Sequence, residues 1–145
     1  MKKEILISCS TALFIFLFAY TALSKFLDYN LFVLQMRKAH LPVMRTIAPV
    51  LGWVVPALET VLVVGLFSRN FRLKALVSAV GLLLIFEIYI AGMLLANQHL
   101  PCTCGGIISK MSWKQHLIFN AVFIGIGTMA IFQIKNYSFF RIGKT

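Results

Sequence analysis

The stretch ALVSAVGLLLIFEIYIAGMLLA, residues 75–96, contains a single charged residue, Glu87. About 20 predominantly apolar residues are enough for an α-helix to cross the hydrocarbon core of a bilayer. A run of this length with one charge is typical of a membrane span. The stretch therefore predicts a transmembrane helix, and the rest of the chain can be compared with that expectation.

Three further apolar blocks, residues 5–23, 51–67 and 117–134, are long enough to cross a bilayer. Of the 145 residues, 60% are hydrophobic and 12% are charged, whereas soluble domains have about half and about a quarter. Some 87 apolar residues supply about four crossings and leave no material for a second domain. We predict one all-α domain, residues 1–145, that forms a polytopic membrane protein with a bundle of four transmembrane helices.

The first block has some features of a signal peptide, because Lys2 and Lys3 precede it. However, the block is longer than a usual signal core, Glu4 interrupts the basic flank, and no A-x-A cleavage site follows. We expect the block to be retained as the first span.

The 14 basic residues outnumber the four acids, for a formal net charge of +10. Most of the basic residues flank the apolar blocks, where we expect them to contact lipid headgroups. They form no basic patch interleaved with exposed aromatic residues, so we expect no nucleic-acid binding. Eight basic residues fall in short segments at one side, and six are spread over two longer loops. Because the denser set is expected to be cytoplasmic, we place both termini in the cytoplasm of a bacterial inner membrane, and the loops 24–50 and 97–114 outside.

The first outer loop contains YNLFVLQMRKAH, residues 29–40, which mixes apolar and basic side chains. Asp28 before it is a good helix N-cap, and Pro42 after it is expected to end the segment. A short interfacial helix fits this pattern, and a partly ordered loop fits it as well.

The second outer loop carries Cys102 and Cys104, separated by one residue. In a bent backbone such a pair can come within disulfide distance, and the resulting ring is strained, which is typical of exchanging disulfides. Pro101 and the pair Gly105–Gly106 supply the backbone angles of a tight turn. We therefore favour redox exchange on the oxidising side of the membrane.

Two other interpretations of the cysteines stay open. His99 and His116 flank the pair and could complete a zinc or copper site, although we favour no metal. The pair could also have no chemistry, although closing so small a ring adds little stability. Cys9 lies near the opposite end of the first span, so we expect it to be a free, buried cysteine.

Glu59 and Glu87 lie within predicted spans, where a carboxylate is costly and usually functional. Counted along their helices, both lie at a similar depth below the outer surface, so they could face each other or one bound molecule. Alternatively, each is protonated and bonded to the backbone or to Asn120. Lys25 could reach the interface or pair with one of the acids. We interpret Tyr89, Trp53 and Trp113 as core or interface residues.

The order of several short motifs resembles the DoxX-like membrane proteins, and within them the methylamine utilisation MauE family. The motifs are Lys25 and Asp28 after the first span, P-A-L-E ending at Glu59, Phe86 with Tyr89, and P-C-x-C-G at 101–105. The resemblance implies a four-helix bundle linked to disulfide formation in exported proteins, alongside a thioredoxin-like partner. It assigns the redox pair to Cys102 and Cys104 and the acid of the second span to Glu59. Gly106 stands where we expect an aromatic residue, so methylamine dehydrogenase is not assigned as the client.

Two functions follow from these observations. The first is a membrane thiol–disulfide oxidoreductase that uses Cys102 and Cys104, passes electrons to a quinone, and has Glu59 and Glu87 as proton carriers. The second is a non-enzymatic subunit that assembles or anchors a larger envelope complex, with the two acids paired to neighbouring helices.

Overall fold

The computed structural model describes residues 2–37, 42–95 and 113–142, and every regular element in these ranges is an α-helix. The helices are α1 (Lys2–Leu27), α2 (Tyr29–Arg37), α3 (Pro42–Phe67), α4 (Arg72–Leu95) and α5 (Trp113–Ile142). Helices α1, α3, α4 and α5 are long and apolar enough to cross a membrane. The predicted all-α class and the four spans are confirmed.

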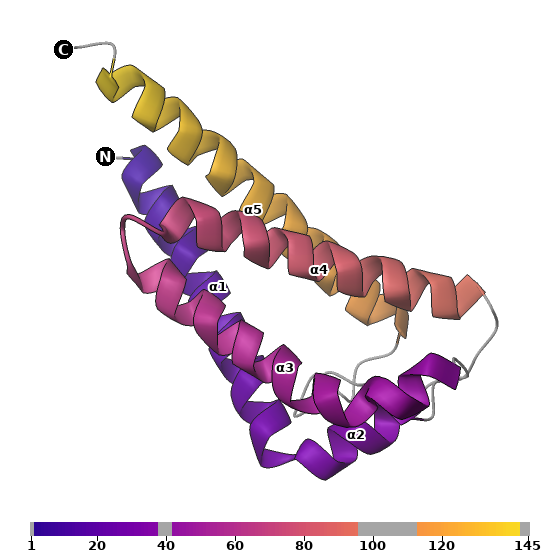
Figure 1. Ribbon diagram of the computed structural model, residues 1–145. Coiled ribbons are helices and arrows are strands. Elements are labelled where there is room, and N and C mark those ends of the chain that lie inside the picture. Colours follow the sequence, from indigo (N-terminus) through magenta and orange to yellow (C-terminus); the bar gives the residue numbers. More distant parts are fainter. Residues whose placement is uncertain (1, 38–41, 96–112, 143–145) are drawn as a thin grey trace.

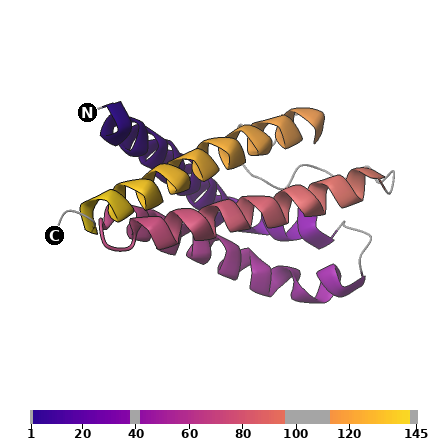
Figure 2. The same cartoon turned by 90° about the horizontal axis from the view of Figure 1, so that it is seen from above.

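The four long helices form a closed ring of neighbours. Helix α1 packs against α3 and α5, and α4 packs against the other faces of the same two helices. Helix α1 begins, and α5 ends, at one end of the bundle, where α3 also turns into α4 (Figures 1 and 2). We call this the first end. Helix α2 lies at the opposite end, which we call the second end.

The interior of the bundle is filled by aromatic and aliphatic side chains. Phe14 and Phe18 of α1, Leu66 of α3 and Leu76 of α4 are each at most 2% exposed. Gly127 of α5 lets the helices approach closely, because a Cβ atom there would overlap the side chains of Val80 and Phe14. Small residues at such crossings are characteristic of packed membrane helices.

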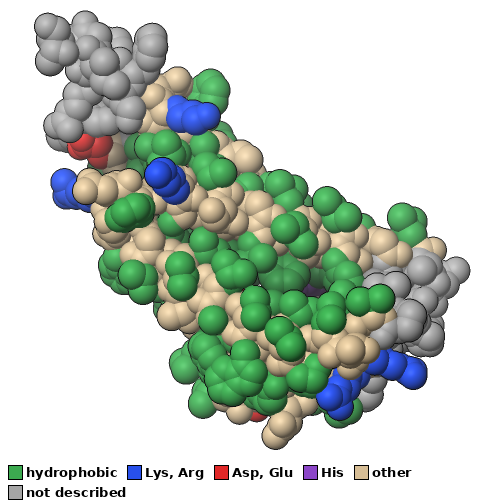
Figure 3. All heavy atoms as spheres, in the orientation of Figure 1, with side chains coloured by type: hydrophobic (Ala, Val, Ile, Leu, Met, Phe, Trp, Pro, Cys, Tyr) green, Lys and Arg blue, Asp and Glu red, His purple; other side chains and the backbone are tan. Residues whose placement is uncertain are grey.

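The outside of the bundle is also apolar, as expected for a surface that faces lipid tails. Phe16 is 76% exposed and Phe132 is 68% exposed. Figure 3 shows hydrophobic side chains over the middle of one face, with Lys and Arg gathered towards its two ends. This distribution fits a bilayer around the middle of the bundle and headgroups at its ends.

The short helix predicted in the first outer loop is present as α2. The carbonyl of Asp28 accepts the first helical hydrogen bond, from the amide of Phe32 at 2.9 Å, as an N-cap residue does. Helix α2 packs on α3 at Gly52, where a Cβ atom would lie 2.7 Å from both Tyr29 and Val33.

The second span begins earlier in the structure than the apolar block 51–67 predicts. We expected the loop to continue to residue 50, whereas α3 already begins at Pro42. Proline suits the first turn of a helix, where its missing N–H has no partner to lose. Pro49 and Pro56 then lie inside α3. The Tyr29 hydroxyl donates to the Pro49 carbonyl at 3.1 Å, one way in which neighbouring groups support a proline-containing membrane helix.

Candidate functional site

A buried ion pair joins α1 to α3. Lys25 lies two residues before the end of α1, and its Nζ is 2.6 Å from Oε1 of Glu59, in the second half of α3. The two side chains are 5% and 2% exposed. Removing two charges from water costs several kcal/mol per ion, so each charge depends on the other for compensation.

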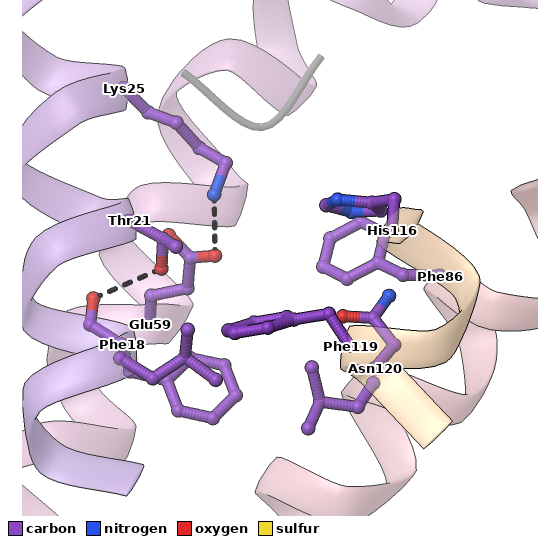
Figure 4. Close-up of a pocket in the computed structure, with 10 residues that line it drawn as sticks. Phe18, Thr21, Lys25, Glu59, Phe86, His116, Phe119 and Asn120 are labelled. Atoms are coloured by element: carbon purple, nitrogen blue, oxygen red, sulfur yellow. Dashed lines mark hydrogen bonds and ion pairs between the residues drawn. The ribbon is translucent and has the colours of Figure 1, made fainter. Parts of the chain in front are cut away.

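A small cavity of about 40 Å³ lies beside this pair. All four long helices line it, and five of its lining residues are polar: Thr21, Lys25, Glu59, His116 and Asn120. Figure 4 shows Lys25, Thr21 and Glu59 on one side, with His116, Phe119 and Asn120 on the other. About 10–15 Å³ is needed to hold one water molecule, so the cavity has room for a few.

The two acids of the membrane spans have different partners. Glu59 pairs with Lys25 and also lies beside the Thr21 side chain. Glu87 is half-buried and is joined to Asn120 by a side-chain hydrogen bond. Of the alternatives that the sequence left open, the pairing of Lys25 with an acid and the bond to Asn120 are the ones the structure contains. Both Glu59 and Asn120 line the small cavity. The cavity therefore lies between Glu59 and the residue that bonds to Glu87.

A second, larger cavity of about 310 Å³ lies where α2, α3 and α4 meet. Its walls are apolar apart from Lys25 and Tyr89. Lys25 and Phe86 line both cavities, so they form part of the wall between them. The Lys25 ammonium pairs with Glu59. It also lies 5.8 Å from the ring centroid of Phe32, which lines the large cavity.

Cys102, Cys104 and His99 lie outside the described residues. The segment that carries them leaves α4 after Leu95 and enters α5 at Trp113. His116, the fourth residue of α5, lines the small cavity and lies one helical turn after Trp113. Within the described ranges no three His, Cys, Asp or Glu side chains cluster as metal ligands. The metal interpretation rests mainly on residues beyond those ranges.

Cys9 corrects one expectation. It is a free cysteine, as predicted, but its side chain is exposed, not buried. It lies on the outer face of α1, because the interior of the bundle at this level is filled by Ile7, Ser10 and Thr11. The side chain therefore faces the lipid.

Thr21 and Phe119 are part of the site and were not predicted. Thr21 precedes Lys25 by four residues, the spacing that places two side chains on the same face of a helix. That spacing was a usable signal once Lys25 was a candidate. Phe119 carries no such signal, because an aromatic residue in an apolar span is ordinary.

Comparison with protein families finds the family described as methylamine utilisation protein MauE, matched over residues 3–133. This match includes α1 to α4 and the first two thirds of α5, with both cavities and the Cys102–Cys104 motif. Comparisons with curated proteins and with solved structures gave no significant match. The chain belongs to the MauE family of multi-pass membrane proteins.

Proposed function

We propose that this protein is an inner-membrane thiol–disulfide oxidoreductase whose Cys102–Cys104 pair exchanges with a thioredoxin-like partner or an exported client protein. The observation that carries the proposal is the place of the cysteine motif in the sequence. The motif falls between Leu95 and Trp113, and His116, one helical turn after Trp113, lines the cavity that borders the buried ion pair. Membership of the MauE family and the C-x-C chemistry support the same function.

The exchange proceeds in two bond changes. A thiolate of the partner attacks one sulfur of the Cys102–Cys104 disulfide, which breaks that bond and forms a mixed disulfide. The partner's second thiolate then attacks the mixed disulfide. The partner leaves oxidised, and Cys102 and Cys104 are left as two thiols that hold two electrons and two protons.

Reoxidation requires an acceptor in the membrane, and a quinone is the appropriate class. The S–S bond between Cys102 and Cys104 re-forms as the quinone takes up two electrons and two protons and becomes a quinol. Glu59 and Glu87 are the proton carriers in this proposal. The small cavity between Glu59 and Asn120 has room for water, and Asn120 bonds to Glu87, so protons have polar groups to move along.

The orientation follows from the charges. The first end of the bundle carries Arg69, Arg72 and Lys74 at the turn between α3 and α4. Basic residues in short loops face the cytoplasm, so both termini are cytoplasmic and the second end is outside. In this orientation the cysteine segment lies on the oxidising side, where disulfides persist.

The test is to trap the thiol state of Cys102 and Cys104 in intact cells with a mass-shifting alkylating reagent, in a Cys9→Ser background. We expect a mixture of oxidised and reduced forms, and a mixed-disulfide adduct with a partner in Cys104→Ser. A matched control carries Cys9 and lacks both other cysteines, and it should form no adduct.

A pair that stays fully oxidised, gives no adduct, and can be replaced by serine without loss of function contradicts the proposal. That outcome favours the non-enzymatic assembly subunit. Metal analysis of the purified protein tests the remaining alternative, in which stoichiometric zinc or copper would identify a metal site.

A further inference from the structure

We infer that the large cavity between α2, α3 and α4 is the binding site for the ring of the quinone acceptor, and that Lys25 is the hydrogen-bond donor to one of its carbonyl oxygens. This inference rests on the proposed function for the identity of the acceptor. It adds the location of the acceptor and a role for Lys25.

The cavity has the size and lining of a small-molecule site. Its volume of about 310 Å³ falls at the lower end of the range of known ligand pockets, about 300–1,000 Å³. Such pockets are mostly apolar, with a few polar groups that orient the ligand. Here the walls are aliphatic and aromatic side chains, and Lys25 and Tyr89 are the polar lining residues.

Lys25 is placed to serve both cavities. An ammonium group has three N–H donors, and one of them is engaged by Glu59 at 2.6 Å. Its Nζ also lies 5.8 Å from the centroid of the Phe32 ring, which lines the large cavity. The other N–H groups are therefore available at the border of the large cavity, where an acceptor oxygen would bind.

This arrangement favours a quinone over a lipid acyl chain. An acyl chain needs apolar walls alone and gains nothing from a buried ammonium or a phenol. A quinone ring has an apolar face for the walls and two carbonyl oxygens that accept from N–H and O–H donors. A positive group at such an oxygen also stabilises the negative charge that builds up there during reduction.

Lys25 and Glu59 also connect the ring site to the proton carriers. Glu59 lines the small cavity and contacts Lys25, which lines both cavities. The two protons required by the balanced reaction can thus reach the border of the large cavity from Glu59. Lys25 is a positioning residue for Glu59 in addition to its contact with the ring.

The experiment uses full-length protein in lipid nanodiscs and a decyl-substituted azidobenzoquinone as photoaffinity probe, with labelled peptides mapped by mass spectrometry. We expect labelling in α2, α3 and α4 at the large cavity. Ile85 lines this cavity and is 65% exposed, whereas Ile88 on the same helix is 71% exposed and is not part of the lining. Ile85→Trp should reduce labelling at least tenfold, and the matched control Ile88→Trp should leave it unchanged.

Three further variants test the polar groups. Tyr89→Phe removes one hydroxyl and should lower labelling several-fold. Lys25→Met should lower it further, and Lys25→Arg should restore part of it, because arginine retains the charge and the donors. Each variant is used only if it elutes as the folded protein does.

The inference is overturned if labelling maps elsewhere, or if Ile85→Trp labels like the wild type. It is also overturned if a saturated lysophospholipid displaces the probe as well as unlabelled quinone does, since the cavity then holds an acyl chain. Wild-type protein, measured both for photolabelling at the large cavity and for thiol exchange of Cys102 and Cys104 in cells, separates the two proposals. Labelling that persists without any thiol exchange in cells removes the proposed function alone, and exchange without labelling at the cavity removes this inference alone.

Discussion

Lys25 Nζ and Glu59 Oε1 lie 2.6 Å apart in the interior of a membrane bundle, at a level where α1 is about to end and α3 is in its second half. The pair connects the two helices and borders both cavities. From the level of this pair, α3 extends back to Pro42, whereas α1 ends two residues after Lys25. The first part of α3 contacts α2, where Tyr29 and Val33 lie against Gly52.

The first prediction concerns this ion pair. Lys25→Met or Glu59→Gln should each lower the free energy of unfolding by about 3–5 kcal/mol, because each leaves a buried group without compensation. The double variant Lys25→Met with Glu59→Gln should lose less stability than the sum of the two single losses, because neither buried charge then remains without its partner. The measurement is unfolding in detergent, with the exposed Lys74→Met as control. Strictly additive losses would contradict the coupling.

The second prediction concerns the close approach at Gly127. Gly127→Val should destabilise the bundle by about 1–3 kcal/mol, since Val80 and Phe14 occupy the space that the new side chain needs. Gly125→Val is the matched control on the same helix, because a Cβ atom there meets nothing within 4 Å. Thermal unfolding of the purified proteins distinguishes the two. An equal loss of stability at both sites would show that valine destabilises the protein through its low helix propensity and not through steric overlap.

The third prediction concerns the docking of α2. Gly52→Val should displace α2 from α3, because Tyr29 and Val33 leave no room for a Cβ atom. Hydrogen exchange of the amides of residues 29–37 should become faster, while Gly92→Val, in open surroundings on α4, should not change it. Unaltered exchange in Gly52→Val would mean that α2 adjusts without leaving its place.

The fourth prediction concerns orientation. In a chain without native cysteines, Asn70→Cys at the turn between α3 and α4 should be protected from a membrane-impermeant thiol reagent in cells with an intact inner membrane. Asp28→Cys, at the start of α2, should be labelled. Both positions are exposed in the structure, so a difference in labelling reports the side of the membrane. The reverse pattern would place the cysteine segment in the cytoplasm and remove the basis for disulfide exchange there.

Much of the fold could be predicted because membrane spans are encoded locally. A long apolar block has to be helical in lipid, where every backbone N–H and C=O needs a partner within the segment. The boundary at Pro42 could not be predicted in this way, because a proline can either end one helix or begin the next. In the structure the first part of α3 contacts α2, and the Tyr29 hydroxyl donates to the carbonyl of Pro49.

The candidate site could also be predicted only in part. Glu59 and Glu87 were candidates from residue type and depth alone, since carboxylates are rare within spans. Their different partners could not be derived, because the rotation of each helix about its axis is set by packing. The same rotation turned Cys9 outward, against the expectation of a buried cysteine.

By itself, the sequence determined the number of spans, the helical class, the family and the residue types available for chemistry, because these depend on composition and on short motifs. Tertiary structure alone decided that Lys25 pairs with Glu59, that Asn120 holds Glu87, and that two cavities share Lys25 and Phe86. These relationships join residues 33 or more positions apart, and their geometry depends on how whole helices are rotated and shifted against one another.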